Sequence, residues 1–386
     1  MNSGAVPDGH KFNYSSTRPI ESYIVLRCKK VDIRNFFSSR WLITVSGLLI
    51  GITTAFLVRV GNPYNAGIAP TCFIRDTAGA LGLHNGITFQ YLRPELVGFV
   101  LGSFISACAF REFRPRGGSA PLVRFVLAAM LMLGALTFLG CPTRVIVRLS
   151  GGDLNALTGL AGMVLGIIVG ILLIKRGFDF SRAKPLPTTA GFIVPLAMIG
   201  LLLLILFKPA FIHYSKSGWG FEHAAIGISL LAGLLIGVLA QRTRLCFMGA
   251  WRDLFLVRNT YLLTGVFAFF AGALTFNIFF GQFRLGFENQ PMAHTHHLWN
   301  FLAMTLVGLS AALLGACPLR QLVISGEGDN DAAVTVLGMF AGAAIARNFG
   351  LSSCEGKLVE FGPIAVIVGL AVCLTIGLFM RPRNSI

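Results

Sequence analysis

Long apolar runs separated by short polar segments dominate the chain. A helix needs roughly 20 apolar residues to cross the hydrocarbon core of a bilayer. Ten runs approach this length: 41–60, 94–112, 122–140, 154–175, 189–207, 223–240, 260–281, 299–316, 331–347 and 361–380. The pattern predicts an all-α polytopic membrane protein with about ten transmembrane helices.

The composition supports this class and argues against a soluble enzyme. Hydrophobic residues make up 55% of the 386-residue chain and charged residues only 12%, whereas a soluble domain carries about a quarter charged residues. The 45 glycines are typical of transmembrane helices that approach closely through small residues. We therefore expect the lipid bilayer to be the principal surroundings of the chain.

The net charge of +16 first suggests nucleic acid, but the basic residues fall mostly in short segments between apolar runs. This distribution follows the positive-inside rule and predicts no nucleic-acid partner. Basic residues cluster in four segments that would all lie inside: 111–124, 175–184, 242–258 and 381–383. The sequence thus predicts a multi-pass protein of the bacterial inner membrane with both termini cytoplasmic, including a basic tail over residues 1–40.

An internal repeat divides the chain. Residues 141–166 read CPTRVIVRLSGGDLNALTGLAGMVLG and residues 317–342 read CPLRQLVISGEGDNDAAVTVLGMFAG, with ten identical positions of 26. A weaker pair, CFIRD at 72–76 and CFMGAWRD at 246–253, occurs in the same order. Each copy contains five spans, and an odd number inverts the second copy, as in transporters whose sites lie near the bilayer midplane.

This repeat sets the expected domain limits. We predict a first membrane repeat over 41–207, a periplasmic linker over 208–222, a second membrane repeat over 223–380 and a cytoplasmic C-terminal tail over 381–386. In the inverted arrangement the cysteines of the first copy, Cys72 and Cys141, approach from outside. Those of the second copy, Cys246 and Cys317, approach from inside.

The repeated Cys-Pro motifs carry candidate chemistry. Proline favours the first position of a helix and disfavours helical geometry in the residue before it. Each span is therefore expected to break at Cys141 or Cys317, with a short or re-entrant helix starting after it. A thiol at a helix N-terminus lies beside free N–H groups and a positive dipole end, which favours thiolate and binds anions.

Arg144 and Arg320 lie three residues after these cysteines, where either could face an anion or balance a thiolate. The simpler alternative is that proline kinks the helix and cysteine merely fits. Asp76 and Asp253 follow arginines, which fits an intramembrane ion pair or a helix-end anchor equally well. Asp153 and Asp329 fit helix N-caps.

No cofactor or metal site is expected. The chain has no CxxC motif, which argues against a zinc site. His294, His296 and His297 form a group with metal-binding chemistry, but an exposed polar loop explains them better. A phosphate-binding Gly-Lys-Ser/Thr loop is also missing from the sequence, which argues against direct use of ATP.

These motifs resemble the YeeE/YedE family of sulfur-compound membrane proteins over roughly residues 41–380. The resemblance rests on Cys72-Phe73, Gly140-Cys141-Pro142 and Ala316-Cys317-Pro318. It implies inverted halves, concave on both faces, with a relay of Cys72, Cys141 and Cys317 along a central path. The Cys246-Phe247-Met248 element is more similar to the YedE branch, proposed to handle selenium, and adds Cys246 as a fourth thiol.

Two functions of different classes follow from these patterns. The first is a transporter that imports a selenite- or thiosulfate-like anion past Cys72, Cys141, Cys317 and Cys246, with Arg144 and Arg320 offsetting its charge; the thiols either donate hydrogen bonds or exchange covalently. The second is a membrane sulfurtransferase that passes persulfide sulfur or selenium to a carrier without net transport. The family resemblance also implies a small cytoplasmic sulfur-carrier protein as a partner. A purely structural scaffold leaves the repeated Cys-Pro-x-Arg unexplained.

Overall fold

The computed structural model describes residues 40–353 and 356–380, so the expected basic tails lie almost entirely outside the described residues. The first half of this part contains α2 Arg40–Arg59, α3 Pro70–Ala80, η1 Ile87–Phe89, α4 Pro94–Ala109, β1 Arg116–Gly117, α5 Pro121–Phe138, α6 Pro142–Ser150, α7 Asn155–Lys175, β2 Lys184–Pro185, α8 Thr188–Gly191 and α9 Ile193–Phe207. The second half contains α10 Ile226–Thr243, α11 Phe247–Val257, α12 Tyr261–Phe279, α13 His297–Leu314, α14 Pro318–Gly326, α15 Asn330–Asn348 and α16 Gly362–Phe379.

Nine helical segments of the described chain are long and apolar enough to cross a membrane, which confirms a polytopic all-α protein. The tenth expected span, 331–347, forms the 19-residue helix α15 but is not among the nine. Its ends are polar, because Asp331 lies in the first turn and Arg347 in the last.

The two halves repeat the same order of helices. Each has a long helix, a short one, two long, a short one and two more long: α2, α3, α4, α5, α6, α7 and α9 correspond to α10, α11, α12, α13, α14, α15 and α16. Contacts between the halves are reciprocal, since α2 packs on α12 and α4 on α10, while α5 packs on α15 and α7 on α13. Exchanging the two halves reproduces this list, which is the signature of a two-fold relation.

The connections group by the membrane side that the charge pattern assigns to them. Strand β1, in the loop after α4, pairs with β2, in the loop after α7, and Arg116 of β1 also bridges to Asp329. The loop after α6 instead pairs with the segment before α13, through Asp153 and Gly286. The loop after α6 and the loop after α14 thus meet different groups of connections, as inversion requires.

Glycines allow the long helices of the two halves to touch backbone to backbone. A Cβ on Gly162 of α7 would lie 2.0 Å from the carbonyl oxygen of Phe301 in α13. A Cβ on Gly47 of α2 would lie 2.2 Å from that of Gly265 in α12. Such close approach through small residues is how transmembrane helices gain packing energy without a hydrophobic driving force.

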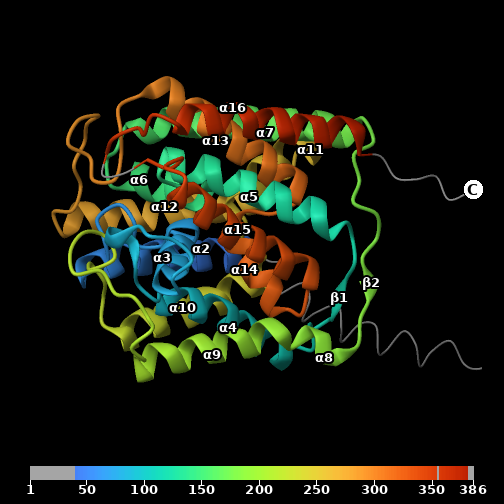
Figure 1. Ribbon diagram of the computed structural model, residues 1–386, viewed down its shortest axis with the longest axis horizontal. Coiled ribbons are helices and arrows are strands. Elements are labelled where there is room, and N and C mark those ends of the chain that lie inside the picture. The colour runs from blue at the N-terminus through green and yellow to red at the C-terminus, as the bar shows by residue number, and fades with distance from the viewer. Residues whose placement is uncertain (1–39, 354–355, 381–386) are drawn as a thin grey trace, which may run out of the picture. The chain divides into compact units, whose positions relative to one another are not determined.

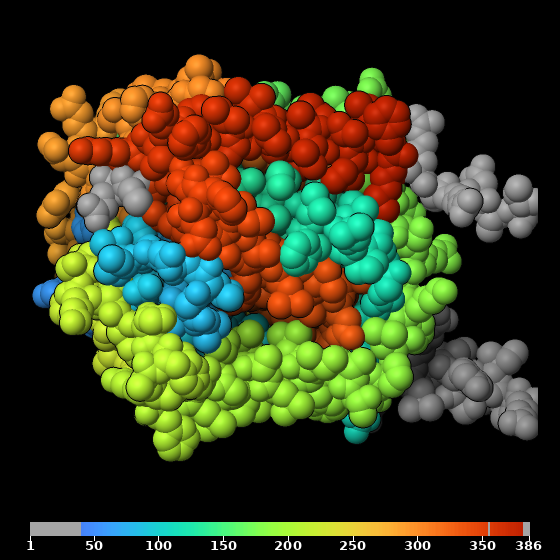
Figure 2. All heavy atoms as spheres, in the orientation of Figure 1, coloured from blue at the N-terminus to red at the C-terminus, as the bar shows by residue number. Residues whose placement is uncertain are grey.

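The last long helix of each half lies at the periphery. Figure 1 shows α9 and α16 along opposite edges of the view, and their side chains form the lower and upper borders of the face in Figure 2. Large apolar side chains on both are exposed, among them Leu196 and Phe207 on α9 and Ile364 and Phe379 on α16. Exposed apolar surfaces of this kind suit contact with lipid, whereas buried arginines such as Arg75 and Arg144 lie on α3 and α6.

Candidate functional site

The short helices position the repeated cysteines at helix starts. Cys141, Cys246 and Cys317 are the N-cap residues of α6, α11 and α14, each with extended backbone. Cys72 lies in the first turn of α3, which begins with Pro70. The helix break expected at each Cys-Pro is therefore confirmed, and the three N-cap thiols lie beside backbone N–H groups at the helix starts.

Cys72, Cys141 and Arg144 form what we call the first-half cluster. The Cys141 thiol lies beside Cys72 and Thr71, and Nη1 of Arg144 lies 3.5 Å from the Cys72 sulfur. All three side chains are buried, with at most 3% exposed. Helix α6 supplies Cys141 and Arg144 from a single turn, whereas Cys72 comes from α3.

The positive charge of Arg144 has no carboxylate partner among the described residues. Its Nε donates to the carbonyl oxygen of Asn65 at 2.9 Å, Nη1 donates to that of Leu139, and Nη2 is buried without a hydrogen-bond partner. Arg148, one turn later, instead pairs with Asp153 at 2.6 Å. Because an unpaired buried charge is costly, the first-half cluster is suited to holding an anion.

Cys246 and Cys317 form the second-half cluster. The Cys246 sulfur accepts backbone N–H bonds from Gly249 at 3.2 Å and from Cys317 at 3.3 Å, and the two thiols contact each other. Both residues are buried. Two backbone N–H groups and a second thiol thus meet at the Cys246 sulfur.

Arg320 differs from its counterpart Arg144. Its Nη2 pairs with Glu327 at 3.0 Å and its Nη1 lies 3.3 Å from the carbonyl oxygen of Ala240. The guanidinium is thus engaged by a carboxylate, and its expected role beside the anion stays a prediction. The repeat explains the difference, because Glu327 occupies the position that Gly151 holds in the first half.

The arginines beside the aspartates form ion pairs in both halves. Asp76 binds Arg75 at 2.6 Å and Arg93 at 2.8 Å, with all three side chains about 1% exposed. Arg252 binds Asp253 at 2.9 Å, with roughly a quarter of each side chain exposed. The sequence pattern contained no signal for Arg93, which reaches Asp76 from the loop before α4.

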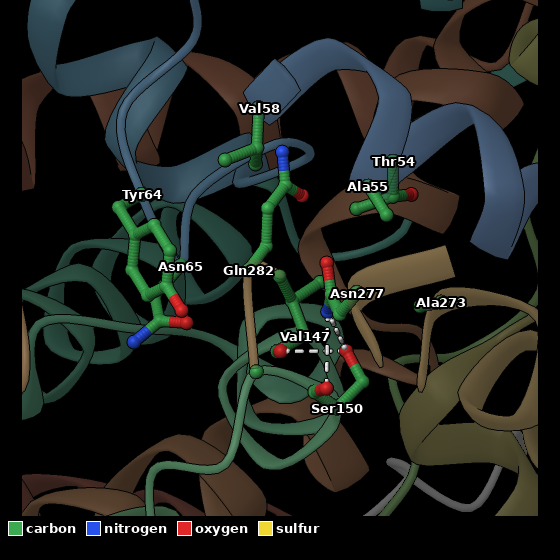
Figure 3. Close-up of a pocket in the computed structure, with 11 residues that line it drawn as sticks. Thr54, Ala55, Val58, Tyr64, Asn65, Val147, Ser150, Ala273, Asn277 and Gln282 are labelled. Atoms are coloured by element: carbon green, nitrogen blue, oxygen red, sulfur yellow. Dashed lines mark hydrogen bonds between the residues drawn. The ribbon is translucent and has the colours of Figure 1, made fainter. Parts of the chain in front are cut away.

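A small pocket lies next to the first-half cluster. It is lined by residues of α2, α6 and α12 and of the loops at 64–65 and 282 (Figure 3). Asn65 links the two features, since its side chain lines the pocket and its carbonyl oxygen binds Arg144. In Figure 3, Gln282 extends between Tyr64 and Asn277, and Asn277 donates to Ser150. The lining side chains include amides and hydroxyls but no carboxylate.

The described residues contain no group of three or more His, Cys, Asp or Glu side chains arranged to hold a metal ion. The expectation of an exposed histidine loop is wrong for His294, which is 2% exposed and has its Nε2 2.9 Å from the carbonyl oxygen of Thr137. Burial lowers the pKa of His294 to about 4, so the ring is neutral at physiological pH. His296 and His297 are exposed, as expected.

The chain is similar to known sulfur-transport proteins. The family model described as "Sulphur transport" matches residues 17–169 and 242–381. A curated relative, the thiosulfate transporter TsuA of Spirochaeta thermophila, is 31% identical over 103 residues. The matched stretch covers 27% of this chain and 31% of that relative, so the likeness to TsuA spans less than a third of its length.

Proposed function

We propose that this chain, which belongs to the sulphur transport family, imports a small sulfur or selenium anion of the thiosulfate or selenite type across the bacterial inner membrane. The observation that carries the proposal is the buried guanidinium of Arg144, which contacts Cys72 and has no carboxylate partner among the described residues. A buried cation beside soft thiols suits an anion with a polarisable sulfur or selenium atom.

The path runs from the first-half cluster to the second-half cluster. The anion enters from the periplasm and first meets Cys72, Cys141 and Arg144; it then passes to Cys317 and Cys246. Contacts between α3 and α14 and between α6 and α11 join the helices that carry the two clusters. Arg320 lies beside the second cluster, but Glu327 offsets its charge, so the anion is held less strongly there. Release toward the cytoplasm follows from this gradient.

Replacing Cys141 with serine tests the path. The hydroxyl keeps a hydrogen bond but is a poor nucleophile and a poorer partner for a soft atom, so we expect initial uptake of radiolabelled thiosulfate and selenite to fall about tenfold. Complete loss indicates covalent thiol exchange, and a partial loss indicates hydrogen bonding. Cys373→Ser is the matched control. Cys373 is equally buried, but it belongs to neither cluster and contacts Ser310 instead. Full uptake by Cys141→Ser would contradict both forms of the relay.

Contact between the two thiols of the second-half cluster favours a second candidate, transfer of persulfide sulfur or selenium to a small cytoplasmic carrier protein without net transport. This function needs reactive thiols on one side only, whereas the charged cluster of the first half is then unexplained. Purified protein in sealed vesicles discriminates the two functions. Uptake is first measured without any carrier protein, and labelling is then measured after a carrier is added. Accumulation of labelled anion inside the vesicles supports import, and its absence together with labelling of an added carrier supports transfer.

A further inference from the structure

The two halves differ at two positions next to the cysteines. Thr71 precedes Cys72 in the first half, and Leu245 precedes Cys246 in the second. Thr143 follows Cys141-Pro142, whereas Leu319 follows Cys317-Pro318. Both hydroxyls thus belong to the half in which the arginine has no carboxylate partner, and both leucines to the half in which Glu327 engages the arginine.

Among the described residues, neither hydroxyl donates to a protein oxygen, and Thr71 has only the Cys141 thiol beside it. Thr71 and Thr143 are fully buried, and the Oγ1 atom of Thr143 has no partner among the described residues. A buried threonine within a helix normally donates to the carbonyl four residues earlier, as Thr335 does to Asp331 at 2.9 Å. Thr71 and Thr143 each occupy the second position of a helix, after Pro70 and Pro142, where no helical carbonyl lies four residues back.

The buried donors lie on the two helix starts that carry the thiols of the first-half cluster. Thr71 neighbours the Cys141 thiol, Thr143 lies between Pro142 and Arg144 in the first turn of α6, and Nη2 of Arg144 is also unpartnered. Two hydroxyls and one guanidinium nitrogen would bind three or more oxygen lone pairs. In the second half, Leu245 and Leu319 are fully buried and apolar, so the equivalent space offers thiols without these donors.

We propose that Thr71, Thr143 and Arg144 form an oxyanion subsite that recognises the oxygen atoms of a sulfur or selenium oxyanion, while the cysteines contact its soft atom. This inference rests on the proposed function and names Thr71 and Thr143 as specificity-determining residues for it. The subsite distinguishes oxyanions from soft anions without oxygen. It also predicts that sulfate, which presents oxygen atoms and the same charge, competes with thiosulfate for the first half.

The test measures thiosulfate binding to purified protein in lipid nanodiscs by calorimetry, with sulfate as competitor. We expect Thr71→Val and Thr143→Val each to weaken thiosulfate binding about tenfold, because each removes a hydrogen bond to a charged group. Competition by sulfate should weaken in parallel. Thr71→Ser restores the hydroxyl and should bind like the wild type. Thr335→Val is the matched control, since its hydroxyl is already satisfied within α15.

A thermal unfolding midpoint without anion separates recognition from a structural role. We expect Thr143→Val to unfold at the wild-type temperature or above it, because it replaces an unsatisfied buried hydroxyl with a methyl group. Thr71→Val loses only a weak contact with the Cys141 thiol and should unfold close to the wild-type temperature. Wild-type affinity for thiosulfate in both valine variants overturns the subsite. Weak binding that accompanies a lowered unfolding midpoint, and that Thr71→Ser does not restore, overturns it as well. If the wild type itself binds neither thiosulfate nor selenite, the proposed function fails and the subsite with it.

Discussion

We expect replacement of Arg144 with methionine to remove most uptake of the anion while leaving the anion-free protein at least as stable as the wild type. The guanidinium is fully buried, and its partners are the carbonyl oxygens of Asn65 and Leu139 and the Cys72 sulfur. These groups compensate only part of the cost of desolvating a charge. Methionine has a similar length and no charge. The anion-free protein is therefore relieved of the desolvation cost of a buried charge, and the bound anion no longer has a positive charge beside it.

The expected loss of uptake is at least about hundredfold, since a charge-assisted hydrogen bond and a buried Coulomb interaction disappear together. Initial rates of labelled uptake measure the first effect, and thermal unfolding of purified protein measures the second. Arg148→Met is the matched control: Arg148 is also fully buried but pairs with Asp153, so its replacement should destabilise the fold. If the Arg144→Met protein inserts into the membrane normally and still takes up the anion at the wild-type rate, the proposed role is contradicted.

Replacing Asp76 with asparagine has the opposite signature, a large loss of stability of about 3–5 kcal/mol. Asp76 is the shared partner of Arg75 and Arg93, and all three side chains are about 1% exposed. The neutral amide would leave two buried guanidinium groups without their carboxylate. The free energy of unfolding in detergent, or the yield of folded protein, measures this change.

Asp253→Asn provides the control for this change, because Asp253 occupies the corresponding place in the second half. Its pair with Arg252 is roughly a quarter exposed, so solvent and salt screen it and we expect a loss of only about 0–1 kcal/mol. Equal losses in the two variants would show that burial does not distinguish the two ion pairs.

The membrane class, the repeat and the helix starts were all predictable because they depend on local rules. Apolar run length predicts spans, and the observed α4 begins at Pro94 as expected. The Cys-Pro dipeptides predicted helix breaks at Cys141 and Cys317, since proline restricts its own backbone and that of the preceding residue. Asp329 caps α15 by accepting from the N–H of Ala332, which confirms its expected role.

What only the tertiary structure decided is which side chains meet. The repeat predicts equal roles for Arg144 and Arg320, yet Glu327 binds one and no described carboxylate binds the other. Likewise, no spacing rule pairs Arg93 with Asp76 or brings Cys246 against Cys317. Local rules act over one helical turn, whereas these partners are chosen by how helices far apart in the chain pack, and in a low-dielectric interior that choice determines which charge is left for a ligand.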